Sequence, residues 1–88
     1  MSHQLEDALA ELDRAAEDAD GDVREDVRET AAAFEEYIDD DQKPDHAVLD
    51  GHLNTLRQAR ERASGDTEDR IGRALESAES YREELDQA

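Results

Sequence analysis

The chain lacks cysteine and tryptophan, and it has only one proline, one lysine and three aromatic residues. The absence of cysteine excludes disulfides, thiolate metal sites and cysteine nucleophiles. No apolar run in the sequence approaches the ~18 residues that cross a membrane. The N-terminus also lacks a basic region followed by an apolar stretch. These absences predict a cytoplasmic protein that makes no membrane contact.

Acidic residues dominate instead, with 27 Asp and Glu against 10 Lys and Arg and a formal net charge of −17 over 88 residues. Such a composition is typical of disorder, of a nucleic-acid mimic that binds a basic protein, or of a folded protein adapted to concentrated salt. One lysine against nine arginines, and 14 alanines against one proline, favour the last interpretation. At molar salt the Debye length is ~3 Å, so the surplus charge is screened. We therefore expect the acidity to be a solvent adaptation, with K⁺ or Na⁺ loosely associated.

The sequence repeats itself at an offset of 44 residues, which is half of its length. Residues 5–37 align with residues 49–81 and share ten identities. These identities include leucines of an apolar stripe, the Gly-Asp dipeptides at 21–22 and 65–66, and the tyrosines at 37 and 81. Self-similarity at a fixed offset indicates that one supersecondary unit occurs twice.

Each half is predicted to form a helical hairpin, because its apolar residues recur at spacings of three and four. In the first half the stripes are Leu5, Leu9, Leu12, Ala16 and Ala19, then Val23, Val27, Ala31, Phe34 and Ile38; in the second they are Leu49, Leu53, Leu56 and Ala63, then Ile71, Ala74, Leu75, Ala78, Tyr81 and Leu85. Gly21 is expected to close the first helix in a left-handed conformation, and Asp22 to cap the next one. Pro44 ends the second helix, since proline cannot continue one.

The predicted fold class is therefore all-α: an antiparallel four-helix bundle built from two repeated helical hairpins. The hairpins span about residues 4–40 and 45–87 within a single helical domain of residues 1–88. The narrow stripes contain much alanine, which predicts a thin core. Such a core suits a monomer, and it also suits a dimer that buries more of the face carrying Phe34, Tyr37 and Tyr81.

Several short sequences carry a resemblance to a known group of proteins. They are the paired Gly-Asp turns, Pro44-Asp45-His46 at the opening of the second hairpin and Tyr81-Arg82-Glu83 near the end. With these features the chain resembles a family of short acidic haloarchaeal all-helical proteins of unknown function. The resemblance covers nearly the whole chain. It implies a halophilic archaeal origin and a helical fold, and it brings no catalytic residues.

The sequence contains no arrangement that is typical of catalysis or cofactor binding. There is no Glu-x-x-His pair of the kind that holds iron in helical bundles, no phosphate-binding glycine loop and no nucleophile elbow. His46, Asp50 and His52 are weak metal candidates, because His46 and Asp50 share one helix face at i, i+4 while His52 points elsewhere. We expect no catalytic residue, no cofactor and no enzymatic activity.

Two groups of residues depart from the acidic background and are candidates for a partner surface. The first is Arg57, Arg60 and Arg62, in a half of the chain whose net charge is −5 (11 acids, six bases) against −12 (16 acids, four bases) in the other. The second is the aromatic group Phe34, Tyr37 and Tyr81. The alternative for the arginines is pairing with acids of neighbouring helices or of their own. The net negative charge opposes direct binding to nucleic acid.

The preferred functional interpretation is a non-enzymatic accessory module that acts through protein–protein contacts, including self-association. One alternative is an acidic nucleic-acid mimic, or an antitoxin-like regulator, that sequesters a basic protein. A second alternative is a weak metal-binding bundle. Composition and spacing leave the partner open in each case.

Overall fold

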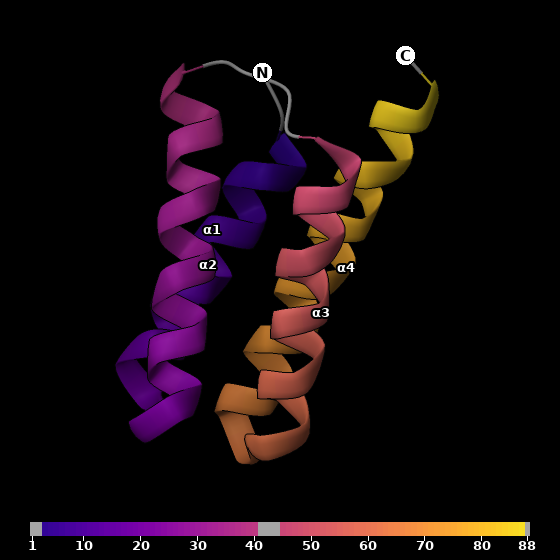
Figure 1. Cartoon of the computed structure of the whole chain (residues 1–88). Helices are drawn as coiled ribbons and strands as arrows, with labels where there is room; N and C mark the ends of the chain where they lie inside the picture. Colours follow the sequence, from indigo (N-terminus) through magenta and orange to yellow (C-terminus); the bar gives the residue numbers. More distant parts are fainter. Residues whose placement is uncertain (1–2, 41–44, 88) are drawn as a thin grey trace.

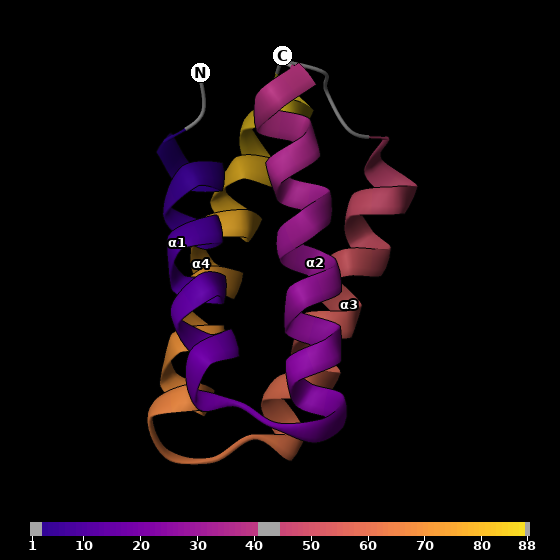
Figure 2. The same ribbon diagram turned by 90° about the vertical axis from the view of Figure 1, so that its left-hand side faces the viewer.

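The computed structural model describes residues 3–40 and 45–87, and these residues form four α-helices. The helices are α1 (His3–Asp18), α2 (Gly21–Asp40), α3 (His46–Arg62) and α4 (Gly65–Gln87). Figures 1 and 2 show both tight turns, between α1 and α2 and between α3 and α4, at one end of the molecule. Neighbouring helices run antiparallel. The predicted fold class, an antiparallel four-helix bundle, is confirmed.

The helices form a ring in which each one packs against two neighbours. α1 lies between α2 and α4, and α3 completes the ring by contacting the same two helices. The contact between α1 and α4 is the most extensive, and the contact between α2 and α3 is the least. Each helix consequently has an inner side, two flanks against its neighbours and an outer side that meets no other part of the described chain.

The core follows the predicted stripes with small shifts. The buried apolar residues are Leu5, Ala8, Leu12, Ala15, Ala16, Ala19, Val27, Ala31, Phe34, Leu49, Leu53, Leu56, Ala59, Ile71, Ala74, Leu75, Ala78 and Tyr81. Leu9, predicted as core, is only partly buried, because the buried side of α1 runs through Ala8 and Ala15. Ala63 and Leu85 also lie at the edge of the core. Alanine fills much of the interior, so the core is as thin as the sequence predicted.

The glycines of the two Gly-Asp turns share one backbone conformation, but the helix boundaries next to them differ from the predicted ones. Gly21 and Gly65 have φ values of 60° and 61°, which confirms the left-handed conformation. Each glycine is the first residue of the following helix and comes three residues after the last residue of the preceding one, Asp18 or Arg62. Asp22 therefore lies inside the first turn of α2, so its predicted role as N-cap was wrong. Ala63 follows the last residue of α3 and has an extended conformation, so α3 ends before the turn at Gly65.

Helix α3 begins at a defined cap. Asp45 has an extended conformation, and its side chain accepts a hydrogen bond of 3.2 Å from the Ala47 N–H. An N-cap of this kind satisfies one of the amide groups that the first turn leaves free. The helix then continues through Gly51 without interruption. Pro44, which the sequence analysis placed between the hairpins, lies outside the described residues.

None of the described helices combines the length and the hydrophobicity that a bilayer crossing requires.

Candidate protein-docking surface

The arginines of α3 contact neighbouring helices. Arg57 lies 3.8 Å from Glu79 on α4, and Arg62 lies 2.5 Å from Asp26 on α2. The guanidinium of Arg60 packs over Gly72 on α4, where an added Cβ would lie 3.1 Å from the Arg60 Cζ atom. Arg57 and Arg62 therefore pair with acids of neighbouring helices, as the alternative interpretation predicted. Arg60 instead packs on a glycine of α4.

One of these ion pairs has a counterpart in the other hairpin. On the opposite side of the bundle, Asp18 of α1 lies 3.6 Å from Arg70 of α4. At the 44-residue offset, position 18 corresponds to 62 and position 26 to 70. The Asp18–Arg70 and Arg62–Asp26 pairs are thus the same contact between hairpins, with acid and base exchanged. The sequence repeat would have revealed this only if the packing of the hairpins had been known.

The aromatic residues proposed as a partner surface are mostly core. Phe34 is fully buried and Tyr81 is 9% exposed, so neither presents a face to a partner, and that part of the prediction was wrong. Both side chains lie on the inner sides of their helices because the bundle closes over them. Tyr37 alone is half-buried, and burial together with the adjacent Glu36 carboxylate raises the pKa of its hydroxyl.

The weak metal candidates contact other groups. Asp50 accepts hydrogen bonds of 2.5 and 3.2 Å from Arg82 on α4, and these bonds lower the pKa of its carboxyl group. His52 faces α2, where its ring centroid lies 6.3 Å from those of Phe34 and Tyr37. Within residues 3–40 and 45–87 no group of three or more potential ligands that could hold a metal ion is found. The described geometry therefore adds no support for a metal site at His46, Asp50 and His52.

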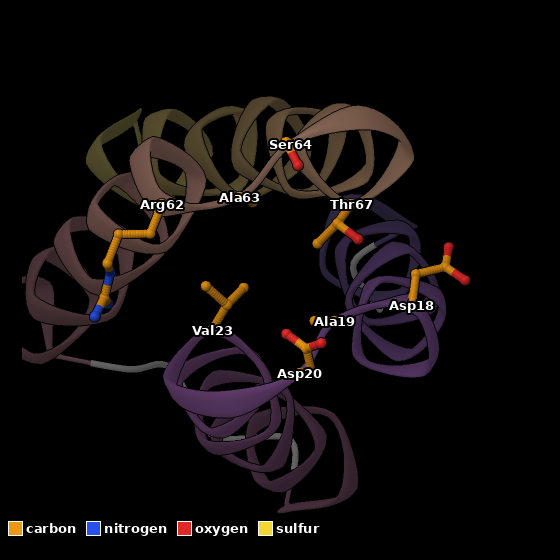
Figure 3. A pocket seen from close by; sticks show the side chains of 8 residues that line it. All are labelled: Asp18, Ala19, Asp20, Val23, Arg62, Ala63, Ser64 and Thr67. Atoms are coloured by element: carbon orange, nitrogen blue, oxygen red, sulfur yellow. The ribbon is translucent and has the colours of Figure 1, made fainter.

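An opening of about 230 Å³ lies between the two turns at one end of the bundle. Figure 3 shows Val23, Asp20 and Ser64 around it, whereas Arg62 and Asp18 point away from its centre. The first turns of α2 and α4 border the opening, and helix N-termini carry positive partial charge. The positive partial charge would attract an anion, whereas the Asp20 carboxylate would attract a cation. We therefore assign no ligand to this opening.

A different surface stands out once the helices are in place. We call it the α3 outer face; it consists of Ala47, Val48, Gly51, Asn54, Thr55 and Gln58. None of these residues carries charge, and Val48 is 50% exposed. Thr55 is half-buried, and its hydroxyl donates a hydrogen bond of 3.1 Å to the Gly51 carbonyl oxygen. The two charged residues of this stretch, Asp50 and Arg57, point instead to α4 and pair with it.

The other helices expose mainly charged residues. Six of the eight exposed residues of α1 are charged, as are seven of nine on α2 and seven of nine on α4. Between positions 47 and 58 of α3, only two of seven exposed residues are charged, and these are the paired Asp50 and Arg57. The sequence analysis missed this face. Its signal was the spacing of uncharged residues at 47, 51, 54 and 58, which follows a helix period.

The geometry defines a small all-helical bundle protein in which the outer side of α3 is uncharged from Ala47 to Gln58, up to exposed Glu61. The chain belongs to the family of unknown function DUF7553, whose model matches residues 1–84. No curated protein and no solved structure matches the chain. The family assignment agrees with the expectation of a family without an assigned function.

Proposed function

We propose that this protein is a non-catalytic interaction module that docks on another protein through the α3 outer face. The observation that carries the proposal is the absence of charge from that face in a chain with a net charge of −17. The lysine-poor acidity supports the further proposal that the module works in the salt-rich cytoplasm of a halophilic archaeon. Neither the core nor the arginine pairs require an uncharged outer face on α3.

The physical reason is the cost of desolvation. Charged groups at the centre of an interface lose their hydration and must be paired, so interface centres are depleted in charge. Exposed positions on α1, α2 and α4 carry many charges that a partner would have to desolvate. The α3 outer face presents methyl groups, a helix backbone at Gly51 and two amide side chains, which hydrogen-bond without carrying charge.

The acidic-mimic alternative has less support. A mimic of nucleic acid would gather its acids on one face, whereas exposed acids occur on α1, α2 and α4. The two alternatives also predict opposite effects of salt. A complex with a basic protein weakens as salt screens the attraction, whereas docking through an uncharged face is kept or strengthened when the surplus negative charge is screened.

Site-specific photo-crosslinking in cells that make the native protein tests the proposal. A photoreactive residue replaces Asn54 on the α3 outer face, and matched controls carry it at Ala32 on α2 and Ser80 on α4, which are exposed and uncharged. We expect discrete adducts, identified by mass spectrometry, from position 54 only. Equal adducts from all three positions, or none from position 54, would contradict the proposal.

A further inference from the structure

We infer that the bundle opens along the boundary between α2 and α3, beginning at the end that carries the two turns, and that salt concentration sets the open fraction. We call this boundary the α2–α3 seam. Its residues are Val23, Asp26, Phe34 and Tyr37 on α2, and His52, Arg62 and Ala63 in and after α3. The inference concerns a motion within one chain, so it does not depend on the proposed function.

The two contacts that join the hairpins are unequal. The contact between α1 and α4 is the most extensive in the ring, whereas the contact between α2 and α3 is the least extensive. Ala8 and Ala15 on α1 and Ala74 and Ala78 on α4 are fully buried, and such small side chains favour close approach of helix axes. Arg70 of α4 also lies 3.6 and 3.7 Å from two carboxylates of α1. The α1–α4 contact therefore holds the hairpins together when the seam opens.

The seam is well filled only at the end away from the turns. There the rings of Phe34, Tyr37 and His52 pack together, with centroids 6.3 or 6.4 Å apart. At the turn end, Val23 and Ala63 border the opening of about 230 Å³ (Figure 3). Atoms that line such a space lack packing partners on one side and lose dispersion attraction. Separation of α2 from α3 therefore costs least at the turn end.

An ion pair joins the two helices at this loosely packed end. Arg62 of α3 lies 2.5 Å from Asp26 of α2, and both side chains are partly exposed. A pair in contact with water contributes little to stability, because solvent already stabilises the separated charges. The pair therefore biases the seam toward the closed state without locking it.

The hairpins repel one another, and salt controls this repulsion. Residues 1–44 have a net charge of −12 and residues 45–88 a net charge of −5, in a bundle 21 × 19 Å across. The Debye length is ~30 Å at 0.01 M salt and ~3 Å at 1 M, so only dilute salt lets the repulsion act across the bundle. The Arg62–Asp26 contact is shorter than either length, so it outlasts the repulsion as salt rises. We therefore expect an open seam in dilute salt and a closed one in concentrated salt.

Distances between pairs of spin labels, measured by pulsed electron paramagnetic resonance, test the inference. The chain has no cysteine, so two introduced thiols take up the only labels. Glu29→Cys with Gln58→Cys labels exposed positions of α2 and α3, and the control Glu17→Cys with Arg73→Cys labels exposed positions of α1 and α4. From about 1 M to about 0.01 M KCl, we expect a longer-distance population between α2 and α3 to grow about fivefold or more. The α1–α4 distances should stay unchanged.

A second measurement uses two matched substitutions in the labelled α2–α3 chain. Arg62→Asp places a carboxylate beside Asp26 across the seam, whereas Arg57→Asp places one beside Glu79, within the second hairpin. Both substitutions change the net charge equally. At about 0.1 M KCl, we expect Arg62→Asp to raise the open population about two- to fivefold, the range for a partly exposed ion pair. Arg57→Asp should raise it less, and equal effects would overturn the inference that the seam pair favours closure.

Three further outcomes would overturn the inference. The first is an α2–α3 distance distribution that does not change down to about 0.01 M KCl. The second is equal lengthening of the α2–α3 and α1–α4 distances, which would show uniform expansion of the bundle. The third is loss of helical circular dichroism in step with the longer distances, which would show unfolding instead of opening. Photo-crosslinks from position 54 test the proposed function separately, because they do not require the seam to open.

Discussion

The two hairpins share one fold and differ in the charges they carry. Residues 1–44 have a net charge of −12 and residues 45–88 a net charge of −5. At the 44-residue offset, four acids of the first hairpin are replaced by arginine in the second. These pairs of positions are Asp13 and Arg57, Asp18 and Arg62, Asp26 and Arg70, and Glu29 and Arg73.

This difference adds ion pairs to the apolar core that the two hairpins share. Position 18 contacts position 70, and position 26 contacts position 62. If positions 62 and 70 held acids, as their repeat counterparts 18 and 26 do, both contacts would join like charges. With arginine at 62 and 70, both contacts become ion pairs. The comparison teaches that the leucine stripe and the turns occur in both hairpins, whereas charges at matching surface positions differ and form ion pairs between the hairpins.

The largest expected effect concerns the core, where position 34 holds Phe and its repeat counterpart, position 78, holds Ala. Both residues are fully buried. We expect Phe34→Ala to lower the free energy of unfolding by about 3–5 kcal/mol, because it leaves a cavity in a thin core. Urea unfolding followed by circular dichroism measures the loss. Tyr37→Ala, at a half-buried ring, is the control with a smaller loss. A loss below ~1 kcal/mol for Phe34→Ala would mean that the ring is not core.

The next effect separates the repeated glycines, Gly21 and Gly65, from Gly51, which has no counterpart in the first hairpin. Gly21→Ala and Gly65→Ala should each lower the free energy of unfolding by about 1–2 kcal/mol, because a Cβ disfavours the left-handed conformation. Gly51→Ala should raise it by up to ~1 kcal/mol, because Gly51 is helical and its surroundings are open.

Thermal or urea unfolding of the three single variants provides the glycine comparison. The Gly51 measurement uses dilute protein, so that association does not contribute. Destabilisation by Gly51→Ala under these conditions would show that the glycine serves the monomer.

A smaller effect concerns the exchanged ion pairs. Arg62→Asp should cost roughly 0.5–1 kcal/mol at low salt, because it places two carboxylates together on a partly exposed surface. The double variant Asp26→Arg with Arg62→Asp restores the pair in reverse and should recover most of that loss. A double-mutant cycle at about 0.05 M and about 1 M KCl measures the coupling. A coupling of zero at low salt would remove the electrostatic account of hairpin docking.

The smallest effect is the pH dependence at the Asp50–Arg82 pair. Hydrogen bonds from Arg82 lower the pKa of Asp50 in the folded protein. The pair therefore stabilises the fold above the ordinary Asp pKa of 3.8, and this contribution is lost as the pH falls through the lower, folded-state value. Asp50→Asn should unfold at a slightly lower urea concentration than the unmodified chain at pH 7, and the difference should shrink below pH 3.8. A constant difference across this range would contradict the assignment.

Most of the fold could be predicted, because the signals are local. Leucine spacing at Leu49, Leu53 and Leu56 defined one side of α3, and all three residues are buried. The glycines of both turns indicated a left-handed conformation, which Gly21 and Gly65 adopt. The helix boundaries at the turns differed from the prediction: α2 and α4 begin at the glycines themselves, and α3 ends before Ala63, which is extended rather than helical.

The surface could be predicted only in part. Phe34 and Tyr81 were assigned to a partner surface because an apolar stripe does not say whether another helix of the same chain or a partner covers it. The arginines of α3 were correctly suspected of pairing with neighbouring helices, yet their partners Asp26 and Glu79 are distant in sequence. The α3 outer face went unnoticed because residues such as Asn54 and Gln58 carry no motif.

The sequence by itself determined the helices, the two turns, the repeat and the acidic character, since helix periodicity, glycine conformation and charge are properties of neighbouring residues. Only the tertiary structure decided which side of each helix is enclosed, which carboxylates the arginines meet and which face of α3 remains open. Those features depend on contacts between residues such as Asp26 and Arg62, 36 positions apart. Such contacts form only when the hairpins pack, and they leave the α3 outer face as the least charged exposed part of α3.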